Sequence, residues 1–114
     1  MPRNLPWTKE EIILALNLYF DSSRGAISTS NPNIIQLSYD LNLLKATSQI
    51  NDEVKFRNPN GVCLKLSNFL AIDPSYNGKG MTSFSKLDHE LFMEYYGKIE
   101  KLKKDAMKIK ATLK

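Results

Sequence analysis

The residues best suited to molecular recognition lie in one stretch of the sequence, KFRNPNGVCLKLSNF, which spans residues 55–69. Its candidate binding residues are the polar Arg57, Asn58, Asn60, Lys65 and Asn68, together with Gly61, which lies among them. Asn, Lys and Arg side chains are the donors that proteins use to bind phosphates and base edges. A stretch that only filled a hydrophobic core would not need so many of them. The pattern therefore favours a binding surface, although each Asn is equally suited to capping or turning the backbone.

The distribution of charge points to the same region. The chain has a formal net charge of +4, and residues 55–86 contain five Lys or Arg residues against one acidic residue. A local basic excess is typical of proteins that bind polyanions such as nucleic acids. The alternative, basic residues that only keep a surface soluble, remains open on charge alone.

A glycine-containing basic loop follows at residues 78–80, and its Lys79 is a further candidate for contact with a nucleic acid. The loop lacks the G-x-x-x-x-G-K-[ST] spacing of a phosphate-binding P-loop. Its lysine is suited to a nearby polyanion, and a plain surface loop is the alternative.

The sequence offers no set of residues for catalysis. It has one histidine, His89, beside Asp88 and Glu90, and one cysteine, Cys63. We expect His89 to be solvated and Cys63 to behave as a small buried hydrophobe. No nucleophile with its base and no metal-ligand set can be assembled. We therefore expect this chain to lack enzymatic activity and to bind no metal or cofactor.

The length and composition predict one domain. A chain of 114 residues with 42% hydrophobic and 25% charged residues has the composition of a globular protein with a single core. The single cysteine excludes an intrachain disulfide framework and fits a reducing cytosol. No apolar run approaches the roughly 20 residues of a membrane span, and no secretory signal is recognisable. We expect a soluble, cytoplasmic domain over residues 1–114.

Hydrophobic periodicity and capping residues predict a mainly α fold. A first helix over about residues 8–22 has Thr8 and Glu11 as a capping box, flanked by Trp7 and Ile12 as a hydrophobic staple. A second runs from Pro32 to around residues 45–48. A third runs from Gly61 to about Ile72, with Asn60 as its cap. Residues 54–57 fit either a short β piece or a loop.

A fourth helix is predicted as one long element over residues 86–114, beginning near Leu87 with Ser85 or Asp88 as its cap. Its apolar residues recur at three and four residues: Phe92, Tyr95, Ile99, Leu102, Ala106, Ile109 and Leu113. Such a stripe is typical of a helix that packs against a partner, either a second copy of the chain or a downstream domain. A solvated terminal helix is the alternative. We expect one shared core that contains Trp7, Ile12, Leu16, Tyr19, Leu37, Leu41, Leu66, Phe69 and Phe92.

Three helices followed by a long one describe an arrangement like a helix-turn-helix. In such domains the third helix lies in the major groove, and its N-terminal residues reach base edges. On this interpretation Asn58, Asn60 and Asn68 face bases, and Lys65 contacts guanine or a phosphate. Arg57 contacts a phosphate or reaches into a groove.

The segments PWTKEEIILALNLYF, IIQLSYDLNLL and FRNPNGVCLKLSNFLAIDPSYNGKGM carry a resemblance that covers roughly residues 5–82. The chain resembles the N-terminal region of bacterial HNH endonucleases of the McrA type, which are modification-dependent restriction enzymes. The family pattern has a Trp-[Ser/Thr]-x-Glu-Glu-Leu start, an Arg-Asn-Pro-Asn-Gly-Val-x-Leu-Lys-Leu-x-Asn-Phe block and a Gly-Lys-Gly loop. The resemblance implies a module that recognises double-stranded DNA ahead of a nuclease, in anti-phage defence.

The chain departs from the whole family in its chemistry, because an HNH site needs several histidines to bind its metal. The resemblance therefore implies target recognition, including recognition of a modified base, without the nuclease active site. Two other classes stay open on the sequence: a protein-interaction module whose partner docks on the C-terminal helix, and a small helix-turn-helix transcriptional regulator.

Overall fold

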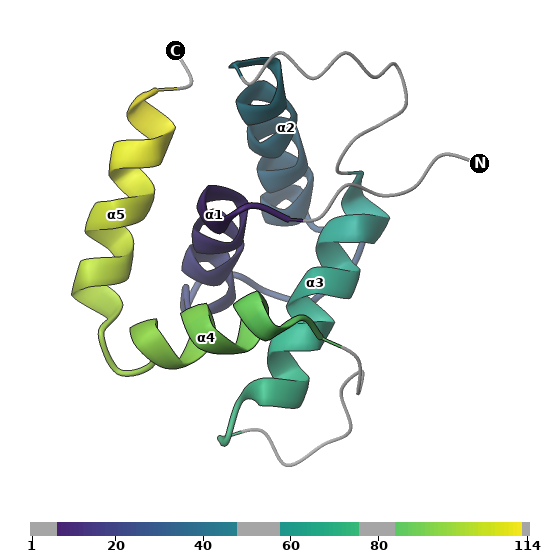
Figure 1. The fold of residues 1–114 in the computed structure, drawn as a ribbon. Coiled ribbons are helices and arrows are strands. Elements are labelled where there is room, and N and C mark those ends of the chain that lie inside the picture. Colours follow the sequence, from purple (N-terminus) through teal and green to yellow (C-terminus); the bar gives the residue numbers. More distant parts are fainter. Residues whose placement is uncertain (1–6, 48–57, 76–83, 113–114) are drawn as a thin grey trace.

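The computed structural model describes residues 7–47, 58–75 and 84–112, and these residues form five helices. The first, α1, spans Lys9–Tyr19 and lies at the centre of the molecule (Figure 1). Its predicted capping box is confirmed: the Thr8 N–H donates to Glu11 Oε1 at 2.8 Å, and the Glu11 N–H donates to Thr8 Oγ1 at 3.3 Å. The helix ends at Tyr19, slightly earlier than predicted.

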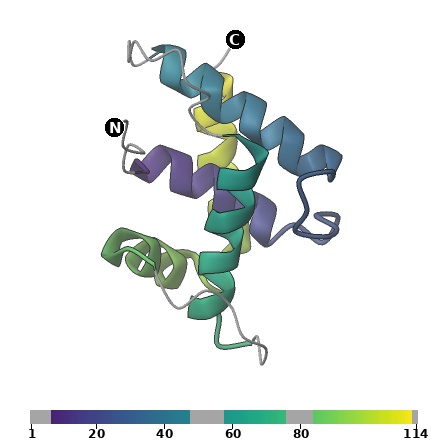
Figure 2. The same ribbon diagram turned by 90° about the vertical axis from the view of Figure 1, so that its right-hand side faces the viewer.

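The other helices surround α1, and their bounds are α2 Pro32–Thr47, α3 Pro59–Ile72, α4 Lys86–Tyr95 and α5 Ile99–Ala111. Helices α3 and α5 both pack on α1, and they lie on opposite sides of it (Figures 1 and 2). None of the helices in the described part of the chain is long and apolar enough to cross a membrane. The prediction of a mainly α fold is confirmed for these residues, among which no strand occurs, while residues 54–57 lie outside them.

The core is built around an α1 that is buried on nearly every side. Residues 12–16 of this helix are all buried, because neighbours cover it from several directions. All nine residues predicted to share one core do so, with Trp7 half-buried at its edge. The Tyr19 ring meets Phe69 and Phe92 edge-on, with centroids 5.7 and 5.8 Å apart, in the arrangement that aromatic pairs favour.

The predicted long helix over residues 86–114 is wrong, because the chain turns sharply between α4 and α5. The Lys98 N–H donates to the Tyr95 carbonyl at 2.8 Å, and the intervening Tyr96 has φ −61° and ψ 121°. Gly97 follows with φ 78°. These values describe a type II turn, whose third residue needs a positive φ and is usually glycine. The apolar spacing continues across this turn and conceals it in the sequence.

The same turn changes the meaning of the apolar stripe. It folds α5 back against α1, where Leu102 and Ala106 are completely buried. Ile109 packs against the same core. The middle of the stripe is therefore occupied within the chain and is not available to a second copy in this fold.

Candidate nucleic-acid interface

Helix α3 begins two residues earlier than predicted. Asn58, not Asn60, is the N-cap, and its Oδ1 accepts a hydrogen bond from the Gly61 N–H at 2.8 Å. Pro59 then occupies the first helical position, where its missing N–H costs nothing. Asn58 therefore has a structural role that accounts for its presence. Asn60 is released from capping, and its side chain is exposed.

This end of α3 borders an open hollow of about 300 Å³ that is lined by Thr29, Asn58, Pro59 and Asn60. The first turn of α3 contains no acidic residue. A helix N-terminus carries a partial positive charge, which favours a phosphate here, although Pro59 has no N–H and the Gly61 N–H is already bonded to Asn58. The half-buried Gly61 is not required by shape, because a Cβ at this position would come no closer than 3.4 Å to Asn58.

Lys65 lies inside the molecule and not on the predicted interface. Its side chain is buried, with a residue exposure of 8%, and its Nζ donates to both carboxylate oxygens of Asp88 at 3.0 and 2.9 Å. The ammonium also lies 5.0 Å from the centre of the Trp7 ring. Asp88 is completely buried and also accepts the Ser85 N–H at 3.1 Å as part of a second capping box. Lys65 thus joins α3 to α4 and is not placed to meet a phosphate.

Asn68 is half-buried, and its amide oxygen faces away from solvent. Its Oδ1 is buried and has no hydrogen-bond partner among the described residues. A base edge outside the protein would not reach this oxygen. Arg57 and Lys79, the two remaining candidates, lie outside the described residues.

The side chains that α3 exposes differ in part from those predicted. Asn60 and Leu64, one turn apart, are both exposed, and Leu64 is 54% exposed. Ser67, a further turn along, is half-buried. Their spacing of four and three residues places them on one face. The apolar character of Leu64 favours a place beside the core, whereas its spacing of four residues from Asn60 indicates the exposed face.

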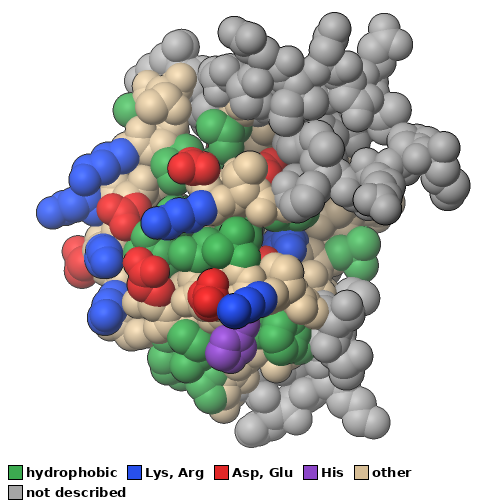
Figure 3. All heavy atoms as spheres, in the orientation of Figure 1, with side chains coloured by type: hydrophobic (Ala, Val, Ile, Leu, Met, Phe, Trp, Pro, Cys, Tyr) green, Lys and Arg blue, Asp and Glu red, His purple; other side chains and the backbone are tan. Residues whose placement is uncertain are grey.

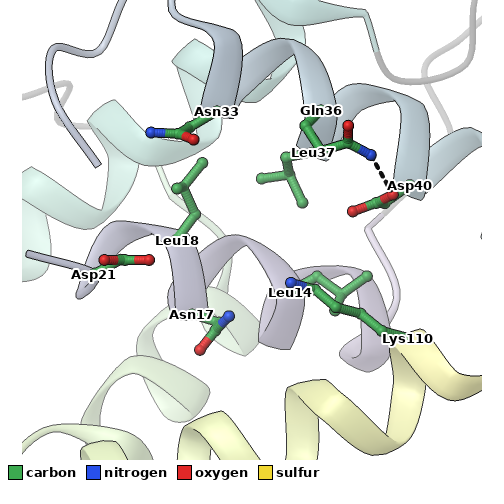
Figure 4. Close-up of a pocket in the computed structure, with 9 residues that line it drawn as sticks. All are labelled: Leu14, Asn17, Leu18, Asp21, Asn33, Gln36, Leu37, Asp40 and Lys110. Carbon is green, nitrogen blue, oxygen red and sulfur yellow. Dashed lines mark hydrogen bonds between the residues drawn. The ribbon is translucent and has the colours of Figure 1, made fainter. Parts of the chain in front are cut away.

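A second hollow, of about 140 Å³, lies between α1 and α2 (Figure 4). It is lined by Leu14, Asn17, Leu18, Asp21, Asn33, Gln36, Leu37, Asp40 and Lys110. The amide of Gln36 donates to Asp40 at 3.0 Å, which occupies one oxygen of that carboxylate. Two carboxylates against one lysine make this hollow unfavourable for a phosphate. Sequence reasoning did not identify it, since its residues come from three helices.

The reactive side chains do not gather in the described part of the chain. His89 is exposed and stacks on Phe84, with centroids 6.0 Å apart. Cys63 is half-buried, and burial raises the pKa of its thiol, which disfavours the reactive thiolate. Among the described residues, no group of three His, Cys, Asp or Glu side chains is placed to hold a metal ion.

Comparisons with known proteins add no identification. No family model matches the sequence, and no match was found among curated proteins or solved structures.

Proposed function

We propose that this chain is a DNA-binding module that serves as the target-recognition domain of a restriction endonuclease in anti-phage defence. The observation that carries the proposal is the exposed Asn60 at the N-terminus of α3, beside an open hollow and without an acidic neighbour in that turn. Asn binds adenine edges through two hydrogen bonds, and a helix N-terminus favours phosphates. The resemblance to modification-dependent restriction enzymes supports the same function.

In the proposed complex α3 lies in the major groove, in the manner of a recognition helix. Asn60 contacts a base edge, Leu64 offers an apolar contact of the kind that recognises a thymine or cytosine methyl group, and Ser67 contacts the edge beyond it. Leu64 is 54% exposed and is therefore accessible for such a contact. Asn58 and Lys65 hold the helix in place and contribute no base contact.

The test is a set of binding titrations by fluorescence anisotropy. Duplexes of identical sequence carry cytosine, 5-methylcytosine or 5-hydroxymethylcytosine, and each is titrated at several salt concentrations. A preferred sequence is selected first from a randomised duplex library. The proposal expects one duplex to bind at least about a thousandfold more tightly than random DNA, as specific complexes do. Equal affinity for every duplex would contradict a target-recognition role.

A further inference from the structure

Helix α5 carries a surface of lysines that the proposed interface does not use. We define the lysine face as Lys101, Lys104 and Lys108, which are exposed; the exposed Lys103 lies on another side of α5, and Lys110 lines the hollow beside α1 and α2. In Figure 3 basic side chains gather on the left, where α5 lies, with acidic side chains between them. Residues 98–112 contain six lysines and two acidic residues, an excess equal to the net charge of the whole chain, +4.

The acidic residues of α5 neutralise this face only in part. Asp105 is half-buried and accepts a hydrogen bond from the Tyr95 hydroxyl at 2.6 Å, so its carboxylate is directed at α4. Glu100 lies in the first turn, where a negative charge stabilises the helix itself. In the described part of the chain, Lys101 pairs with Glu94 at 3.6 Å, and Lys103, Lys104 and Lys108 form no ion pair.

The spacing of the lysines is unfavourable for the helix alone. Lys101, Lys104 and Lys108 recur at three and four residues and therefore lie on one side of α5. Like charges at this spacing repel and destabilise a helix. The helix C-terminus stabilises Lys108 in part, and the ion pair with Glu94 offsets part of the charge of Lys101. Glu100, four residues before Lys104, offsets part of the charge of that lysine, so only part of the repulsion remains. A polyanion bound along the face would remove the repulsion.

We infer that the lysine face binds the phosphate backbone of duplex DNA in a sequence-independent mode. From Lys101 to Lys108 the helix rises about 10 Å, a length of duplex that carries about six phosphate charges. A membrane surface fits less well, because helices that bind membranes insert an apolar face, and here Leu102 and Ala106 are completely buried in the protein core. Lysine supplies charge without reading bases, as expected for non-specific binding.

This surface is separate from the one in the proposed function, although both take DNA. Helices α3 and α5 lie on opposite sides of α1, so a straight duplex held in front of α3 does not lie along the lysine face (Figures 1 and 2). The inference therefore describes a second binding mode. Such a mode would hold the protein on DNA of any sequence, and the proposed α3 contacts would select the target.

The experiment compares two double variants that lose the same charge. Lys104→Gln with Lys108→Gln removes two lysines from the face; Lys9→Gln with Lys86→Gln removes two exposed lysines from α1 and α4 and serves as the matched control. Glutamine keeps the helix propensity of lysine. Circular dichroism and thermal unfolding of both variants establish that they fold like the parent. Affinity for a random-sequence duplex is then measured from about 50 to 200 mM salt.

For the α5 variant we expect the slope of log affinity against log salt to fall by about two. The parent should then lose about tenfold more affinity than this variant over that fourfold range of salt. The control should keep the parental slope. The inference is wrong if both variants change the slope equally, if neither changes it, or if the parent does not bind the random duplex at the lowest salt. It is also wrong if duplex RNA or vesicles of phosphatidylserine and phosphatidylcholine bind more tightly than duplex DNA.

The result is distinguishable from a failure of the proposed function. If the parent binds all duplexes alike and the α5 variant alone lowers the slope, the lysine face stands and the assignment of base recognition to α3 fails. If a preferred duplex is found and the α5 variant behaves like the control, recognition by α3 stands and the lysine face fails.

Discussion

Replacing Lys65 by methionine should destabilise the fold and leave DNA binding unchanged. The substitution keeps an unbranched side chain, one atom shorter, and a similar helix propensity, but it removes the ammonium that lies between Trp7 and Asp88. Asp88 is then left completely buried with a carboxylate that has lost both hydrogen bonds from Lys65. Removing one partner of a buried ion pair costs about 3–5 kcal/mol, because the other charge stays desolvated. A fold of this size has about 5–15 kcal/mol of stability in total, so the loss should be large.

Denaturant unfolding followed by circular dichroism measures this loss directly. The matched control is Lys86→Met, which removes an exposed lysine from α4 and should change the unfolding free energy by less than about 0.5 kcal/mol. A cycle with Asp88→Asn isolates the pair, because asparagine still accepts the Ser85 N–H. The double variant should be more stable than the sum of the two single losses implies, by up to about 3 kcal/mol.

DNA binding by the folded fraction of Lys65→Met supplies the second measurement. A phosphate contact at this position would lower the salt slope by about one, whereas a buried lysine leaves the slope at the parental value. The reasoning is refuted if Lys65→Met is as stable as Lys86→Met, or if it lowers the slope while remaining folded.

Three further predictions concern the elements that hold the two binding surfaces. Burial, together with the hydrogen bond to Asp105, raises the pKa of the Tyr95 hydroxyl. Because a tyrosine in the unfolded chain ionises at a pH of about 10, the unfolding free energy should fall as the pH rises above that value. Tyr95→Phe should make this fall less steep. Gly97→Ala should cost about 1–2 kcal/mol in chemical denaturation because its φ is 78°, whereas Gly61→Ala, inside a helix, should cost nothing. Asn58→Ala should lower stability by about 1 kcal/mol through loss of the α3 cap, and titrations should show parental DNA affinity for its folded fraction.

The sequence was informative where structure is decided locally. The capping box at Thr8 needs only four consecutive residues, so their types and spacing sufficed to predict it, whereas Ser85 and Asp88 were predicted only as alternative caps and together form a second box. The core residues followed from apolar periodicity, because a helix face is set by spacing alone. The expected mainly α fold rested on both features.

The predictions from sequence were wrong where the structure depends on residues distant in sequence or on backbone angles. Lys65 is buried because Asp88, 23 residues away in sequence, meets it in space. Asn58 caps α3 in place of Asn60 because Pro59 occupies the first helical position, where proline is favourable. The prediction had treated Pro59 as a residue that disfavours helix at Asn58. The turn at Gly97 was concealed because apolar residues keep their spacing across it. A glycine inside a heptad pattern was the one local indication of that turn.

The central claim is that the exposed face of α3 recognises DNA bases, and Asn60→Ala tests it most directly. The measurement is the ratio of affinities for the selected duplex and a random duplex, determined for the parent and the variant at one salt concentration. Because Asn60 is exposed and does not cap α3, the account predicts parental thermal stability. It also predicts a loss of about 1–3 kcal/mol on the selected duplex with no change on random DNA. A variant that keeps the parental ratio of affinities would contradict the account.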